Sequence, residues 1–198
     1  MRGRVLRLAL LAARMRRPLR RFLRDKRGVS AVEFAMLLPL MITLYLGGVE
    51  VSSAIAVDRK VTLVARTLGD LVAQATTVTA TDMTNILNAA TTVVQPYSSS
   101  LIKVTVSSVA IDANGVAKVT WSDTKNGTAR AAGSTVTLPT ALNTASTSLI
   151  WAESEYAYTP TIGYVITGTM TLKDQIYMRP RLSNCVQRAG VTSPSPPC

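Results

Sequence analysis

The chain has 198 residues, room for one ordinary domain with an appendage, and 47% of them are apolar. It carries 22 Lys and Arg against 11 Asp and Glu, for a net charge of +11, and it contains no histidine. The missing histidine excludes His-based catalytic triads and most zinc sites, and no Walker A loop, GxGxxG or CxxC motif occurs. We therefore expect no catalytic residue, no metal, no cofactor, and no small-molecule substrate.

The positive charge is concentrated in residues 1–28, which have a net charge of +10, whereas the other 170 residues have a net charge of only +1. This leader contains no aromatic residue beyond Phe22, and no nucleic-acid-binding module follows it, so we expect no nucleic-acid partner. It also contains no Ser or Thr, which argues against a mitochondrial transit peptide. The leader is instead suited to anionic lipid headgroups.

Residues 29–48, VSAVEFAMLLPLMITLYLGG, contain one charge among twenty residues, and the apolar character continues to Val57. Twenty helical residues at about 1.5 Å each cross a hydrocarbon core of about 30 Å, so this segment predicts one membrane-spanning helix. Because the basic residues are concentrated before it, the positive-inside rule predicts a cytoplasmic N-terminus and an exported C-terminal part.

The one charge in this run is Glu33, and an intramembrane acid favours a function with a definite partner. If a peptidase cut after Gly28, Val29 would carry a new amine, and on a neighbouring subunit that amine would be a suitable partner for Glu33. The alternative is that Glu33 reaches back to the lipid headgroups or to Arg27.

The basic leader, Gly28 and the run RGVSAVEFAMLLPLMITLYLGGVEVS closely resemble the opening of TadE-like proteins, pseudopilins of the tight-adherence (Tad) type IV pilus system. The glycine that precedes the second glutamate of the family's opening motif corresponds to Gly47 or Gly48. The other motif residues are Ala31, Val32, Glu33, Phe34, Ala35, Pro39 and Glu50. Weaker similarities lie at Trp121–Ser122, Glu155–Pro160 and Arg179–Arg181. The larger relatives often carry a von Willebrand factor A domain, but this chain is too short for one and shows no DxSxS signature.

The resemblance implies cleavage by a prepilin peptidase between Gly28 and Val29. It also implies a single-pass protein of the bacterial inner membrane with a periplasmic C-terminal domain, and a minor-pilin role in pilus assembly and adhesion. The expected partners are membrane lipids, the peptidase, other pilins or pseudopilins, and Tad membrane proteins, with incorporation into the extracellular pilus as a further step. One departure is Val29, where major type IV pilins usually have Phe.

Two alternatives remain open from the residues. An uncleaved chain would be a bitopic scaffold of the Tad machinery. The A-x-A pattern of Ala54-Ile55-Ala56 would let signal peptidase cut before Val57 and release a periplasmic protein, although the apolar run is longer than an ordinary signal sequence. A membrane-anchored hydrolase is a distant third.

Small residues at Gly48, Ser52 and Ala56 are spaced four apart, which predicts a face for close helix packing. Beyond the membrane, apolar residues continue at spacings of three and four through Ala75. We therefore expect one helix over residues 29–75, about 70 Å long.

The exported part predicts an α+β, pilin-like fold in which this long helix packs on a small antiparallel sheet. Asp82 is expected to cap a short helix that stops before Pro96. Alternating strands are expected at 102–111, 116–122, 148–158 and 169–178, with a hairpin turn at Asp112–Gly115, a bulge near Ser107 and Ser108, and a mobile loop at 123–135. The predicted organisation is leader 1–28, transmembrane helix 29–57, stem and short helix 58–92, β domain 93–182 and Pro-rich tail 183–198.

Cys185 and Cys198 both lie on the predicted exported side, where an oxidising compartment would allow a disulfide; the alternative is two separate thiols. Glu153 and Glu155 lie two apart on a predicted strand and therefore on one face. We interpret them as solvated surface charges and not as an acid-base pair.

Overall fold

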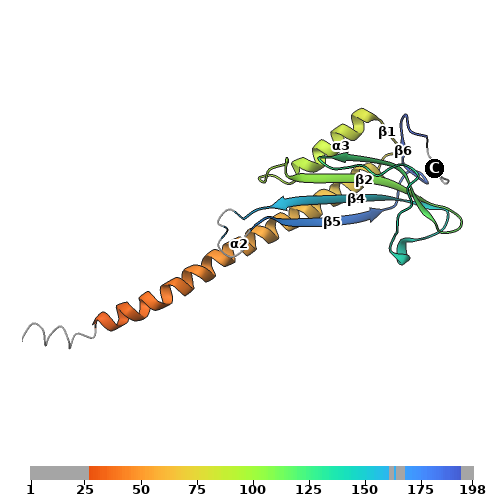
Figure 1. The fold of residues 1–198 in the computed structure, drawn as a ribbon. Helices are drawn as coiled ribbons and strands as arrows, with labels where there is room; N and C mark the ends of the chain where they lie inside the picture. The colour runs from red at the N-terminus through yellow and green to blue at the C-terminus, as the bar shows by residue number, and fades with distance from the viewer. Residues whose placement is uncertain (1–26, 161–162, 164–167, 193–198) are drawn as a thin grey trace, which may run out of the picture. The chain divides into compact units, whose positions relative to one another are not determined.

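The computed structural model describes residues 27–160, 163 and 168–192, and it confirms the α+β class (Figure 1). A long helix is followed by a short helix and a four-stranded antiparallel sheet, and a two-stranded parallel sheet forms separately. The elements are α2 (Arg27–Ala73), β1 (Thr77–Val78), α3 (Ala80–Thr92), β2 (Ile102–Ile111), β3 (Ala117–Lys125), η1 (Thr140–Leu142), β4 (Thr147–Tyr158), β5 (Met170–Met178) and β6 (Gln187–Arg188).

The chain forms two compact units, Met1–Gly48 and Val49–Cys198, and the boundary between them falls inside α2. The predicted end of the membrane span at residue 57 stays a prediction. Within the second unit, the helical residues from Val49 to Ala73 pack on one face of the larger sheet, whose strand order is β3-β2-β4-β5.

The packed face of α2 follows the predicted period of three and four. The side chains that face the sheet are completely buried: Val57, Val61, Val64, Leu68 and Val72. They share one core with alternate residues of β2 and β4, and the predicted inner face of β5 packs against the same core through Met170, Leu172, Ile176 and Met178. The helix ends at Ala73, two residues before the expected end.

The sheet also carries a second, smaller core on its opposite face. Here Val109 and Ile111 of β2 pack with Leu149 of β4 and with Leu138 from the segment between β3 and β4. Strand β2 keeps one continuous register with β4 over its whole length. The apolar residues of β2 therefore change face because the second core lies on the other side, and not because β2 is interrupted.

The bulge expected in β2 lies in its neighbour. The pairing with β3 shifts between Ser108 and Val109, which face Trp121 and Val119 and leave Thr120 of β3 as the additional residue. The Thr120 hydroxyl donates to the carbonyl oxygen of Ser108 at 3.0 Å, so the buried extra residue has a hydrogen-bond partner.

The hairpin turn between β2 and β3 forms where it was predicted. Gly115 adopts a φ of 79°, a left-handed conformation that favours glycine. One carboxylate oxygen of Asp112 accepts hydrogen bonds from the backbone N–H groups of Asn114 and Val116, both at 2.9 Å. The Asp112 side chain thus fixes the turn.

The helix α3 begins one turn earlier than expected. Its N-cap is Thr79, whose hydroxyl accepts from the backbone N–H of Asp82, while the Asp82 carboxylate accepts from the backbone N–H of Thr79 at 3.1 Å. Asp82 is therefore the third helical residue of a capping box and not the cap itself. The Thr79 hydroxyl also donates to the Asp82 carboxylate, and this bond, followed by the one from the Thr79 backbone N–H, lowers the pKa of Asp82 below its usual range.

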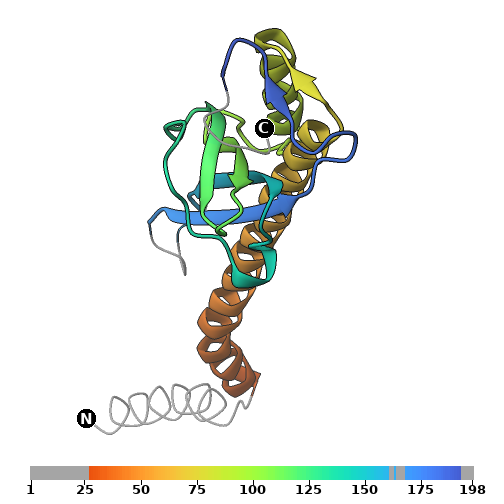
Figure 2. The same cartoon turned by 90° about the vertical axis from the view of Figure 1, so that its right-hand side faces the viewer.

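The parallel pairing of β1 with β6 was not predicted (Figure 2). It brings Thr77 and Val78, which follow α2, beside Gln187 and Arg188 near the end of the chain. Arg188 Nε donates to Asp123 of β3 at 2.8 Å, which ties the small sheet to the larger one.

Candidate functional site

The described side chains of the first unit form an apolar helical surface that is exposed among the described residues. The chain is helical from Gly28 onward, and the stretch that is apolar enough to span a membrane contains no buried residue. Its large exposed side chains are Val29, Val32, Phe34, Met36, Leu37, Leu38, Leu40, Met41, Ile42, Leu44 and Tyr45. Within the part of the chain that the structure describes, α2 is the one helix long and apolar enough, by length and composition, to cross a membrane.

The predicted processing site lies in the first turn of α2. Gly28 has no neighbouring atom within 4 Å of the position that a Cβ would occupy, so other parts of the chain do not shield it. Glu33 follows Val29 by four positions, and on a helix this spacing places both on the same side. The carboxylate of Glu33 is exposed among apolar side chains.

Pro39 of the motif lies inside α2 without ending the helix. Proline has no N–H to donate to the carbonyl of Ala35, one turn earlier. One turn later, the Thr43 hydroxyl donates to the Pro39 carbonyl oxygen at 2.8 Å. This bond is made to the Pro39 carbonyl, one turn after the Ala35 carbonyl that loses its backbone donor.

The second motif glutamate has the opposite environment. Glu50 lies in the second unit and is only 2% exposed, whereas Glu33 is exposed. The motif therefore contains one carboxylate buried in the folded domain and one left available on the apolar helix.

The predicted small-residue face is not used within the chain. Ser52 and Ala56 are exposed, whereas Ala54 and Val57 are buried on the other side of α2. Gly48, in the first unit, has no neighbour within 4 Å of its Cβ position. All three predicted packing residues thus remain accessible to another molecule.

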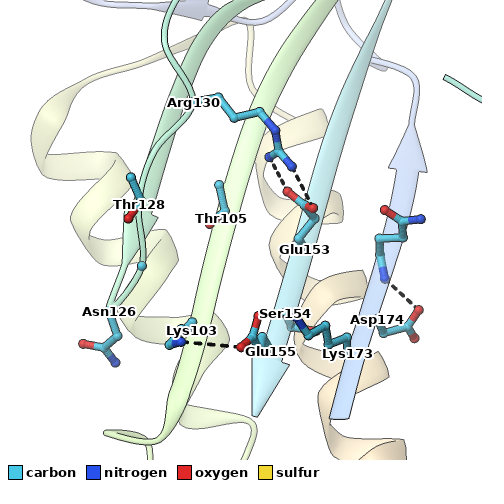
Figure 3. A pocket seen from close by; sticks show the side chains of 12 residues that line it. Lys103, Thr105, Asn126, Thr128, Arg130, Glu153, Ser154, Glu155, Lys173 and Asp174 are labelled. Atoms are coloured by element: carbon cyan, nitrogen blue, oxygen red, sulfur yellow. Dashed lines mark hydrogen bonds and ion pairs between the residues drawn. The ribbon is translucent and has the colours of Figure 1, made fainter. Parts of the chain in front are cut away.

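The outer face of the larger sheet carries a polar hollow that the sequence did not predict as a site (Figure 3). Glu155 lies between two lysines, with Lys173 Nζ at 3.0 Å and Lys103 Nζ at 3.5 Å from its carboxylate oxygens. The hydrogen bond from Lys173 is the largest cause that holds the pKa of Glu155 below its usual range, and Lys103 acts in the same direction.

Glu153 on the same face has its own cation. The guanidinium of Arg130 binds both carboxylate oxygens of Glu153, with Nη2 at 2.9 Å from Oε1 (Figure 3). The same guanidinium lies 3.8 Å from the centroid of the Trp151 ring, which stacks on Tyr177. Burial is the largest cause that raises the pKa of Tyr177, and the Glu153 charge adds to it.

The contacts of Arg130 also contradict the prediction of a mobile loop at 123–135. Strand β3 continues to Lys125, and the loop that follows is held to the sheet at Arg130 and by a bridge between Lys118 and Thr135. Sequence reasoning placed both glutamates on one face correctly. It missed their cations because these come from two other strands and a loop, which only the strand register brings together.

The predicted disulfide is not tested by the geometry. Cys185 is buried, with 6% exposed, and Cys198 lies outside the described residues. The pairing stays a prediction, and mass measurement with and without reductant would detect it.

These features first define a class of protein: an α+β domain whose N-terminal helix begins with an exposed segment suited to a membrane. A family comparison then gives one similarity: the model of the TadE-like protein family matches residues 28–69. The match covers the apolar segment and most of the remaining helix, and it confirms the resemblance seen in the sequence. No curated protein and no solved structure is significantly similar to the chain. The matched segment contains the apolar part of α2, which is suited to a single membrane anchor.

Proposed function

We propose that the protein is a minor pilin, or pseudopilin, that is needed to assemble a Tad pilus in adhesion. The observation that carries this proposal is the uncovered apolar helix with Glu33 one turn after a candidate processing site, in the segment that matches the TadE-like family. An apolar helix of this kind is stable in lipid or against other apolar helices, and a subunit that moves from membrane to fibre needs both.

In the proposed topology the basic leader stays in the cytoplasm and the sheet domain is periplasmic. The charge difference between the two sides of α2 supports this orientation. A prepilin peptidase then cuts between Gly28 and Val29.

Glu33 then guides assembly by pairing with the Val29 amine of an adjacent subunit. An unpaired carboxylate in the membrane is costly, and an opposite charge at close range relieves that cost strongly in a low dielectric. The pairing would fix the axial register of neighbouring helices, and the exposed face at Gly48, Ser52 and Ala56 would let them approach closely. The proposed partners are therefore other pilins or pseudopilins and the membrane proteins of the Tad machinery.

The fold offers an argument against release by signal peptidase. A cut before Val57 would remove Ala54 and Glu50, which are 8% and 2% exposed in the folded second unit, and would expose the end of a core helix. An ion-paired Glu153 and Glu155 likewise favour a structural over a catalytic role for the sheet face, because their carboxylates already bind cations.

N-terminal sequencing of the protein from membranes and from sheared pili tests the proposal. A start at Val29 in both fractions supports it. A start at Met1 would replace it with an anchored scaffold, and a start at Val57 with a released periplasmic protein. A Gly28→Val variant should retain the leader, whereas Gly47→Val in the same helix should be processed normally.

A further inference from the structure

The two edges of the larger sheet differ in how the chain covers them. At the β3 edge, the Val119 N–H donates to the Ser134 carbonyl oxygen at 2.9 Å, and the Gly133 N–H donates to the Val119 carbonyl oxygen at 2.7 Å. At the other edge, β5 pairs with β4 and with no other segment that the structure describes. We call this outer side of β5 the open edge, and an unpaired strand edge is a template for pairing with another chain.

The hydrogen-bond pattern shows which residues of β5 face the open edge. The Ala157 N–H donates to the Leu101 carbonyl oxygen at 3.4 Å, so Ala157 and every second residue before it in β4 direct their backbone groups toward β2. The residues between them bond to β5, and Ser154, one of these, lies opposite Asp174. The odd-numbered residues of β5 therefore direct their backbone groups to the open edge: Thr171, Lys173, Gln175 and Tyr177.

Asp174 is a charged residue on the core-facing side of this strand. Side chains alternate along a strand, and its neighbours on the same side, Leu172 and Ile176, pack against the main core. Asp174 is half-buried and forms no ion pair with any residue that the structure describes. Its carboxylate instead accepts a hydrogen bond from the Gln175 N–H at 2.7 Å (Figure 3). One donor of the open edge is thus already occupied.

The position of Asp174 decides how β5 would pair with a second copy of itself. The strand runs from Met170 to Met178, so Asp174 is its central residue. An antiparallel register that pairs the whole strand with its copy therefore places the two Asp174 residues directly opposite each other. The other pairs in this register are apolar or neutralise no charge unfavourably: Met170 with Met178, Thr171 with Tyr177, Leu172 with Ile176, and Lys173 with Gln175.

The facing Asp174 residues would bring two carboxylates into close contact. Because their backbone groups point toward β4, they would form a pair without mutual backbone hydrogen bonds, whose Cα atoms are about 4.5 Å apart. Like charges directly opposite each other are destabilising, and burial on the core side adds a desolvation cost. Shorter registers are also unfavourable, because one centred on Lys173 sets two lysines opposite each other and one centred on Gln175 sets Asp174 opposite Ile176.

We propose that Asp174 blocks the open edge of β5 against antiparallel pairing with a second copy of the chain. The carboxylate acts in two ways: it occupies the Gln175 N–H, and its charge excludes the register that matches the whole strand. A charged residue on the inner side of an edge strand is a known protection against such pairing. A strand with a basic residue opposite Asp174 would be accepted instead. The proposal concerns the sheet domain and does not depend on the minor-pilin role.

Native mass spectrometry of the full-length protein in detergent, over a range of protein concentrations, measures the pairing. Asp174→Thr removes the charge and the bond to Gln175 and suits a strand, so its dimer dissociation constant should be about tenfold or more below that of wild type. Asp58→Thr is the matched control, because Asp58 is an exposed acid of α2 in the same unit, and it should associate like wild type.

Two further variants identify the edge and the register. Adding Gln175→Pro to Asp174→Thr should restore the wild-type association, because this N–H faces the open edge and its loss costs no bond to β4. Asp174→Lys should stay unpaired by itself and form a one-to-one complex with wild type, because lysine then faces aspartate.

Unchanged association of Asp174→Thr, undiminished pairing of its proline derivative, or no complex between Asp174→Lys and wild type would each overturn the proposal. Circular dichroism of every variant checks that the sheet domain is folded. An N-terminus at Val29 would still support the pilin assignment in any of these cases.

Discussion

The hydroxyl of Ser154 in β4 donates a 2.8 Å hydrogen bond to the carbonyl oxygen of Val61 in α2, and both residues are buried. The surrounding interface is otherwise apolar, and apolar contacts have no preferred direction. This bond therefore gives the helix a definite position along the sheet. The ion pair between Arg181 and Asp70 of α2 acts further along the same helix.

Replacement of Ser154 by alanine should lower the free energy of unfolding by about 1 kcal/mol, because a buried hydrogen bond is lost while the Val61 carbonyl keeps its helical partner. Urea unfolding of the full-length protein in detergent, followed by Trp121 and Trp151 fluorescence, measures the change. Ser98→Ala is the control, since the Ser98 hydroxyl bonds to Ser100 at the surface. Equal stability of the Ser154 variant and wild type would show that the bond contributes nothing.

Gly69 lies where α2 packs tightly against β4 and β5. A Cβ at Gly69 would lie 3.3 Å from both Ala152 Cβ and Met178 Sδ. Gly69→Val should destabilise the protein by about 1 to 3 kcal/mol, because extra volume in a packed core forces neighbours out of position. The same side chain introduced at exposed Arg66 should change the unfolding free energy by less than about 0.5 kcal/mol. Comparable losses of unfolding free energy in both variants would show that the low helix propensity of valine, and not crowding at Gly69, causes the destabilisation.

The ion pairs of Glu155 should make stability depend on pH in the acid range. Its pKa is lowered in the folded state, so its contribution is present above the unfolded value of about 4.3 and is lost as pH falls through the lower folded value. Because the pair is partly exposed, the contribution should stay below about 1 kcal/mol. The stability difference between wild type and Glu155→Gln should therefore shrink on acidification, and also in 1 M salt at neutral pH.

Loss of the Glu33 charge should impair pilus assembly but not membrane insertion. Glu33→Gln keeps the shape and removes the charge, so it should insert normally and be processed, yet fail to support normal piliation. Glu33→Asp keeps the charge one methylene shorter and should recover part of the function. Pilus counts by electron microscopy, with membrane fractionation, measure both effects; wild-type piliation in Glu33→Gln would rule out charge pairing in assembly.

Much of the fold follows from local patterns in the sequence. The buried face of α2 was predicted from its spacing, because a helix with one packed side must repeat every three or four residues. The turn at Asp112–Gly115 and the inner face of β5 were predicted for similar reasons, since glycine and alternation act locally.

The unpredicted features all depend on contacts between distant segments. The apolar residues of β2 change face because Leu138 and Leu149 build a second core there, and nothing within β2 indicates this. The partners of Glu153 and Glu155 required the register of three strands and a loop.

The pairing of β1 with β6 has a consequence for how the protein is made. Thr77 and Gln187 are neighbours in the fold but are separated by most of the domain in sequence, and only ten residues follow Arg188 in the chain. Contacts at such a separation form only when both segments are present, and closing a long loop is slow. The two-stranded sheet can therefore form only after Gln187 and Arg188 have been synthesised, so a chain truncated before Gln187 would leave the β1 segment without its strand partner.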